Sequence, residues 1–154
     1  MGIGIDIDRL ADPTFFAQGR LAAHSDHRCF ASAAEAASGR SSFEVSLDGV
    51  WEFAYAKNPV LAVDGFQDPD YDVSQWDDIP VPAHIQLRGY DLPQYVNVHY
   101  PWDGHEQIDP GGVPQDYNPV ASYVRGFTLP GAPPDGERIV FRANRHEFGA
   151  RGAS

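Results

Sequence analysis

The chain has 154 residues, including 15 glycines and 13 prolines, and 12% of its residues are aromatic. This length suits one domain with a hydrophobic core, and the glycine and proline content disfavours long helices. The formal net charge of −11 would repel the phosphate backbone of a nucleic acid, so nucleic-acid binding is not expected.

The cysteine content and the first residues predict a cellular compartment. Cys29 is the only cysteine, so no disulfide can form within the chain. The N-terminal residues lack the basic and apolar pattern of a secretion signal, because Asp6, Asp8 and Arg9 interrupt them. No apolar run approaches the length that spans a membrane. These features predict a protein of the reducing cytoplasm.

The first forty residues contain one clear helix signal. Residues 1–20 have no sustained hydrophobic period and are expected to be extended. A short helix is predicted over Ala31–Ala37, because Ser32 and Glu35 have the spacing of a capping box. Gly39 is expected to end this helix.

Two groups of potential metal ligands do not complete a site. His24 and His27 are three residues apart and could share a helix face, but no third or fourth ligand follows nearby. Asp68, Asp70 and Asp72 alternate like the first ligands of a calcium loop, yet the glycine and the terminal glutamate of such a loop are missing. No metal site is therefore predicted in the chain.

Alternating aromatic residues predict the main strand of the fold. Trp51, Phe53 and Tyr55 occupy alternate positions of the segment Trp51–Ala56, so they lie on one face of a strand. Aromatic side chains bury about 150–250 Å² each, which makes this face the expected core.

Further extended segments are predicted on either side of the long central loop. Ser122–Leu129 and Glu137–Arg142 are predicted strands, and Arg125 shares the face of its strand that carries aromatic side chains. Ile79–Pro82 is expected to run extended over a surface, because its two prolines exclude a central strand.

The segment from Gly89 to Trp102 combines aromatic residues and prolines around one amide, that of Asn97. Pro93 and Pro101 favour extended backbone in the residues before them. Aromatic faces around one polar group are typical of sites that bind small polar ligands, including sugars. A loop that only closes the edge of a β-sandwich can have the same composition, so the local chemistry leaves both interpretations open.

Several motifs, in the same order along the chain, resemble one protein family. In chain order they are Arg20–His24, Ser46–Phe53, Ile79–Gln86, Gly89–Pro93, Tyr95–Val98, Tyr100–Pro101 and Ser122–Tyr123. The part between Gly89 and Pro101 is similar to the G-Y-D-x-P-x-Y-x-N-V-x-Y-P motif of the family-2 glycoside hydrolases. The matches run from about Arg20 to Phe141, and they resemble the N-terminal sugar-binding domain of the bacterial β-galactosidases.

The resemblance implies an all-β fold, a β-sandwich of the jelly-roll, galactose-binding-like type. A jelly roll has about eight strands, whereas four or five are expected here, so the sandwich is predicted to be incomplete. Residues 1–44 would form an extended N-terminal arm of the subunit-interface type, and residues 45–142 a partial jelly roll. Residues 143–154 do not resemble the family, and we interpret them as a tail derived from a frameshift or a vector.

The resemblance also implies the role of individual residues. The asparagine of the family motif reaches into the galactose pocket, which predicts Asn97 and its neighbour Val98 as substrate-binding residues. The two catalytic glutamates of the family lie on a barrel further along the chain, so no catalytic residue is expected here. This chain alone is predicted to be inactive. No cofactor is expected within the chain, although full-length members typically use Mg and Na ions.

The predicted function is that of an N-terminal domain of a β-galactosidase that hydrolyses terminal β-D-galactosides such as lactose. Its expected partners are the galactoside, the rest of the enzyme chain and further copies of the enzyme, but no nucleic acid and no membrane. Gly19 departs from the family, whose best-known members have asparagine before the Arg20–His24 motif. Two alternatives remain: a free-standing carbohydrate-binding module, and an interaction segment that complements a truncated enzyme.

Overall fold

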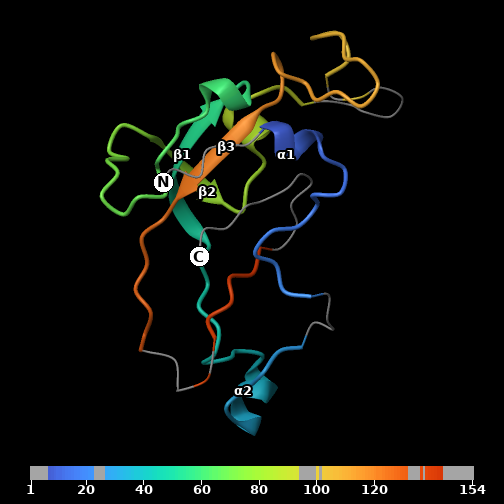
Figure 1. The fold of residues 1–154 in the computed structure, drawn as a ribbon. Coiled ribbons are helices and arrows are strands. Elements are labelled where there is room, and N and C mark those ends of the chain that lie inside the picture. The colour runs from blue at the N-terminus through green and yellow to red at the C-terminus, as the bar shows by residue number, and fades with distance from the viewer. Residues whose placement is uncertain are drawn as a thin grey trace. The chain divides into compact units, whose positions relative to one another are not determined.

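The computed structural model describes residues 7–22, 27–93, 100, 102–131, 136 and 138–143. The chain divides into two compact units, one containing the residues up to Phe16 together with Asp48–Gly126, the other containing Ala17–Leu47 and the residues from Phe127 onward. The helices are α1 (Ile7–Ala11), α2 (Ala33–Ser38) and the 3-10 helices η1 (Pro59–Leu61) and η2 (Ile85–Arg88), and the strands are β1 (Gly49–Ala56), β2 (Asp77–Val81) and β3 (Val120–Val124) (Figure 1).

An antiparallel three-stranded sheet of order β2-β1-β3 organises the first unit (Figure 1). β1 pairs with β2 from Gly49 opposite Val81 to Phe53 opposite Asp77. On its other side β1 pairs with β3, and Phe53 stands opposite Tyr123. The predicted all-β class is confirmed, because the helices are few and short, and the described sheet is not closed.

The core of the first unit lies on the aromatic face of β1, as predicted. Phe53 on β1 and its neighbour Ile79 on β2 are each 1% exposed, and they are the buried hydrophobic residues of the described part of the chain. The ring of Phe53 packs against Tyr123 on β3, with 4.9 Å between the ring centroids. Trp51 and Tyr55 are only half-buried, so the core is centred on Phe53.

Strand β2 lies at the edge of the described sheet. The sequence predicted that Ile79–Pro82 is extended and does not form a central strand. Strand β2 is extended and lies at an edge, so it agrees with both expectations. Pro80 stands opposite Val50, and an edge position tolerates its missing N–H because only one side of the strand is paired.

The two predicted C-terminal strands differ from the structure. β3 begins before the predicted segment Ser122–Leu129 and ends at Val124, because its register follows the end of β1, with Val120 opposite Ala56. The prediction of a strand over Glu137–Arg142 is wrong for its described residues, since residues 138–142 are not in a strand. Their apolar side chains, Ile139, Val140 and Phe141, are all more than half exposed.

The N-terminal expectations are met at α2 but not at α1. The side chain of Ser32 accepts a hydrogen bond of 3.2 Å from the Glu35 N–H, as its capping role requires. Gly39 ends the helix with φ 69°, a conformation that suits glycine at a helix C-terminus. α1 occupies part of a segment that was expected to be extended. No helix in the described ranges is long and apolar enough to cross a membrane.

Candidate functional site

Tyr90 attaches the start of the aromatic segment to the sheet. It directly follows η2 and Gly89, whose φ of 90° turns the chain. Its ring centroid lies 4.6 Å from that of Phe53 and 6.1 Å from that of Tyr55, both on β1. Its hydroxyl donates a hydrogen bond of 2.8 Å to Asp77 Oδ2 on β2. Burial, this hydrogen bond and the Asp77 charge raise the pKa of Tyr90, so the hydroxyl remains a donor at neutral pH.

Asp91, the next residue, has an unusual backbone conformation. Its φ of 57° is the only positive value among the described residues other than glycine. Aspartate adopts this left-handed region more readily than most residues, yet the region remains sparsely populated. Asp91 Oδ1 accepts hydrogen bonds from the Leu92 N–H at 2.8 Å and from the Tyr117 hydroxyl at 2.5 Å. Asp91 makes both bonds in this left-handed conformation.

Tyr117 reaches two segments that are distant in sequence. Besides its hydroxyl contact with Asp91, its ring stacks on the imidazole of His105, with 3.7 Å between the centroids and 15° between the planes. His105 belongs to a turn in which its N–H donates to the Trp102 carbonyl at 3.0 Å. Tyr117 therefore joins the residues before position 94 to those after position 99.

Glu106 fixes the backbone on which Tyr117 stands. Its carboxylate accepts hydrogen bonds from the Asp116 N–H at 3.1 and 3.2 Å and from the Tyr117 N–H at 3.2 Å. Burial acts to raise the pKa of Glu106, but the N–H groups of Gln115, Tyr117 and Asp116 outweigh it and leave the pKa below its ordinary value. The ionised carboxylate is thus the form that organises this loop.

The far flank of the segment carries an aromatic pair. The rings of Tyr100 and Trp102 are stacked, with 5.0 Å between centroids and 4° between planes. The Tyr100 N–H donates to Asp103 Oδ2 at 3.1 Å. Tyr100 and residues 102–112 line a groove, and Tyr100 is 67% exposed. An exposed ring beside carboxylates has the chemistry of a surface that contacts sugars.

The predicted binding residues themselves, Asn97 and Val98, lie outside the described residues. The structure brings together the residues on both sides of them, through Tyr90 and Asp91 on one flank and His105 on the other. The sequence reading did not single out Tyr117 or Glu106, because neither belongs to a motif. Their role depends on contacts across 26 and about 10 residues, which local patterns do not reveal.

The aspartates that alternate like the first ligands of a calcium loop form turns through their side chains. Asp68 Oδ1 accepts the Asp70 N–H at 3.0 Å, and Asp72 Oδ1 accepts the Ser74 N–H at 2.9 Å. These hydrogen bonds to their own backbone are typical of aspartate in turns. Over the residues that the structure describes, no group of three or more His, Cys, Asp or Glu side chains could hold a metal ion. His24 lies outside those residues.

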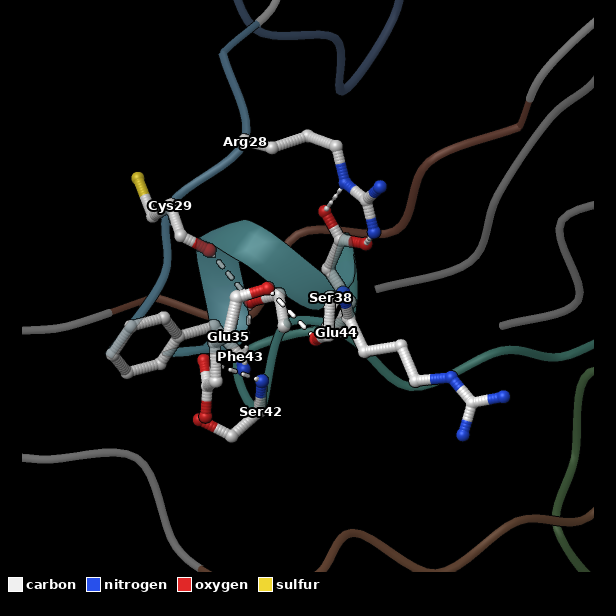
Figure 2. A network of polar contacts seen from close by, with 9 residues as sticks. Arg28, Cys29, Glu35, Ser38, Ser42, Phe43 and Glu44 are labelled. Carbon is white, nitrogen blue, oxygen red and sulfur yellow. Dashed lines mark hydrogen bonds and ion pairs between the residues drawn. The ribbon is translucent and has the colours of Figure 1, made fainter. Parts of the chain in front are cut away.

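The second unit contains a separate polar network (Figure 2). The Arg28 guanidinium donates to both carboxylate oxygens of Glu44, at 3.1 and 2.6 Å, and this hydrogen bonding lowers the pKa of Glu44. Ser41 Oγ donates to the Cys29 carbonyl at 2.6 Å and accepts the Phe43 N–H at 3.1 Å. These hydrogen bonds connect the residues before α2 with those after it. The Arg28–Glu44 ion pair is too exposed to add much stability.

Glu35 joins the two ends of this network. Its Oε2 accepts the Ala31 N–H at 2.9 Å. It also accepts the Ser42 N–H at 3.2 Å (Figure 2). These bonds, led by the one from Ala31, lower the pKa of Glu35. The predicted capping box is therefore present in modified form, with the glutamate reaching the residue before Ser32 instead of Ser32 itself.

The family model described as glycosyl hydrolases family 2, sugar binding domain, matches residues 44–149. The match takes in β1, β2, β3 and the whole segment around Tyr90, Asp91 and Tyr117. The chain belongs to this family. The antiparallel sheet of the first unit is consistent with the β-sandwich of a family-2 sugar-binding domain, and the resemblance inferred from the motifs is confirmed.

Curated relatives of this family-2 chain include β-galactosidases and β-galactosidase large subunits. The chain is 47% identical over 126 residues to a β-galactosidase of Halalkalibacterium halodurans and 44% identical over 124 residues to one of Lactobacillus delbrueckii subsp. bulgaricus. These matches cover 81% and 80% of the chain but only 12% of each relative. A β-galactosidase large subunit of Latilactobacillus sakei is 38% identical over 89% of the chain and 24% of that subunit. The chain thus corresponds to a small part of each relative.

Proposed function

We propose that the chain acts as the N-terminal domain of a β-galactosidase that hydrolyses terminal β-D-galactosides, including lactose. The observation that carries this proposal is the match to the family-2 sugar-binding domain, together with high identity to β-galactosidases of which the chain spans about an eighth. In such an enzyme the domain supplies a substrate contact, and other parts supply the chemistry.

The substrate contact in this proposal is Asn97, with Val98 beside it. An amide suits the task because it donates to one sugar hydroxyl and accepts from another. Support comes from the family motif around both residues and from the fixed positions of their flanks: Tyr90 packs on β1, and Tyr100 and Trp102 are stacked.

Hydrolysis with retention of configuration needs two carboxylates about 5–5.5 Å apart, and we assign these, with the Mg and Na ions of the family, to the remainder of the enzyme. Residues 1–44 are proposed as an arm at a subunit interface of a homo-oligomer and residues 45–142 as the partial jelly roll. The family match extends beyond residue 142 to residue 149, so we do not propose the expected non-family tail over residues 143–154. The single cysteine, Cys29, suits a cytoplasmic location.

The test is a hybrid enzyme in which part of this chain replaces the matching domain of a relative. Residues 44–141 replace the matching segment of the Halalkalibacterium halodurans β-galactosidase, and kcat/KM is measured with a β-galactoside and, as a control for specificity, with the matching β-glucoside. The hybrid is expected to hydrolyse the galactoside, whereas the enzyme lacking this segment is not. A folded hybrid without galactosidase activity would contradict the proposal.

Titration of the isolated chain with galactose, followed by NMR, distinguishes the alternatives. A free-standing carbohydrate-binding module binds the sugar without a partner, whereas a domain that completes another pocket does not. If the chain added separately restores activity to the enzyme lacking the segment, the interaction-segment interpretation gains support.

A further inference from the structure

We propose that Tyr117 is a positioning residue whose hydroxyl and ring act on the two described flanks of residues 94–99, the segment that contains Asn97. The hydroxyl holds Asp91 in its left-handed conformation, and the ring holds the turn that contains His105. The importance of these flanks for sugar binding rests on the proposed function, but the positioning itself does not.

The hydroxyl contact is a charge-assisted hydrogen bond. It joins the phenol of Tyr117 to the carboxylate of Asp91 at 2.5 Å, and such bonds are shorter and stronger than neutral ones. The same Asp91 oxygen also accepts the Leu92 N–H. A non-glycine residue in a sparsely populated backbone region persists only when its surroundings determine it, and such residues cluster at functional sites. Here the Tyr117 hydroxyl supplies a contact from a residue distant in sequence, and we assign it the role of holding this conformation.

The ring contact is independent of the hydroxyl. The imidazole of His105 lies flat on the phenol ring, and the His105 N–H is bonded within its own turn to the Trp102 carbonyl. Glu106, next in the chain, binds the backbone N–H groups of Asp116 and Tyr117. The backbone of Tyr117 is thus bonded to Glu106, in the same turn whose His105 stacks on the Tyr117 ring. Both contacts fix the position from which the hydroxyl reaches Asp91.

Two substitutions separate the hydroxyl from the ring. Tyr117→Phe removes the bond to Asp91 and keeps the stacking on His105, whereas Tyr117→Leu removes both. Tyr71→Phe is the matched control, because Tyr71 is a partly exposed tyrosine of the same unit whose ring contacts Trp76 instead. The readout is amide hydrogen exchange of the full chain, resolved by NMR at Leu92 and His105.

Tyr117→Phe is expected to speed exchange at Leu92 by roughly ten- to a hundredfold, the scale of a lost hydrogen bond to a charged group, and to leave the exchange rate at His105 unchanged. Tyr117→Leu is expected to speed exchange at both amides, and Tyr71→Phe at neither. Unchanged exchange at Leu92 in Tyr117→Phe would overturn the proposal. Equal acceleration at both amides in Tyr117→Phe would also overturn it, because the two contacts would then not act separately.

The pairing with Asp91 is tested by a conservative rescue. Asp91→Asn keeps an oxygen that accepts from the Tyr117 hydroxyl but loses the charge, so the exchange rate at Leu92 should lie between those of the wild type and of Tyr117→Phe. Asp91→Ala should accelerate the exchange of the neighbouring Tyr90 amide, and adding Tyr117→Phe to it should have no further effect. An additive effect of the two substitutions would show that Tyr117 does not act through Asp91.

Kinetics in the hybrid enzyme distinguish this inference from the proposed function. Tyr117→Phe should lower kcat/KM for the β-galactoside, and Tyr71→Phe should not. If the exchange rates change as expected while kcat/KM does not, Tyr117 positions the flanks but this positioning does not contribute to turnover of the galactoside, and the proposed function still depends on the activity of the hybrid. If the exchange rates do not change, the positioning role is wrong whatever the kinetics.

Discussion

The guanidinium of Arg125 lies over the ring of Trp51, 5.9 Å from its centroid. Its Nη1 atom comes within 2.6 Å of the position that a Cβ atom on Gly49 would occupy. Gly49, the first residue of β1, has a φ of 137°. The missing side chain of Gly49 thus gives Arg125 the space to cover the aromatic face of the strand.

Gly49→Ala should therefore destabilise the first unit by about 1–3 kcal/mol, because alanine is strained at this φ and its methyl group displaces Arg125. Urea unfolding followed by tryptophan fluorescence measures the loss. Gly126→Ala is the control, since nothing lies within 4 Å of its Cβ position and its φ is not positive. Equal stability of the two variants would contradict the prediction.

Phe53→Ala should cost about 3–5 kcal/mol of unfolding free energy, as expected for a buried phenylalanine, because Phe53 is 1% exposed and packs against Tyr90 and Tyr123. Val50→Ala, at a position 60% exposed, should change the unfolding free energy little. A small loss of unfolding free energy in Phe53→Ala would show that the core does not lie on this face of β1. Trp51→Ala should cost less than Phe53→Ala, because Trp51 is only half-buried.

Ser32→Ala should weaken α2 by about 1 kcal/mol, the typical value of a helix N-cap. Amide exchange at Glu35 reports the loss, because its N–H donates to Ser32 Oγ. Ser32→Asp retains a capping oxygen and should preserve the wild-type exchange rate. Faster exchange in Ser32→Asp as well would mean that the serine acts in another way.

Stability should fall in acid through three glutamates. Hydrogen bonds lower the pKa of Glu35, Glu44 and Glu106 in the folded chain. Each contribution is therefore complete above the ordinary glutamate pKa of about 4.3 and is lost as the pH falls through the lowered value. Urea titrations between neutral pH and pH ~3 measure the decline. Glu106→Gln should reduce the slope, and an unchanged slope would remove Glu106 from the acid transition.

Asn97→Ala in the hybrid enzyme should reduce kcat/KM for a β-galactoside by roughly tenfold or less, the effect of losing one hydrogen bond to an uncharged group. Leu87→Ala is the control, since Leu87 is 77% exposed and outside the motif. Thermal unfolding should be the same in both variants. Wild-type kinetics in Asn97→Ala would exclude Asn97 from the sugar site.

Local patterns were sufficient where short-range chemistry decides the structure. The alternation of Trp51, Phe53 and Tyr55 located β1, and the spacing of Ser32 and Glu35 located α2. The ends of β3 were not predictable in the same way, because they follow from pairing with β1 and not from the residues of β3. A strand also needs a neighbour to supply hydrogen bonds, so apolar character alone predicted one wrongly at residues 138–142.

The sequence predicted the motif residues of the candidate site but not the contacts that hold the flanks of this motif. Asn97 and the aromatic residues around it were identified from their sequence, and they stay predictions because Asn97 lies outside the described residues. The contacts that hold the flanks are long-range: Tyr90 with Phe53, and Tyr117 with Asp91. The left-handed conformation of Asp91 occurs together with such a contact, and no propensity of aspartate would have located it.

The position of Pro80 favours one edge of the sheet over the other for the pairing of further strands. Pro80 lies on β2, at one edge of the described sheet, and has no N–H group. Proline in an edge strand discourages further strands from pairing there. The outer edge of β3, from Val120 to Val124, contains no proline. A further strand that joins the described sheet should therefore be added beside β3, whether it comes from the same chain or from another molecule, so that folding and aggregation would use the same edge.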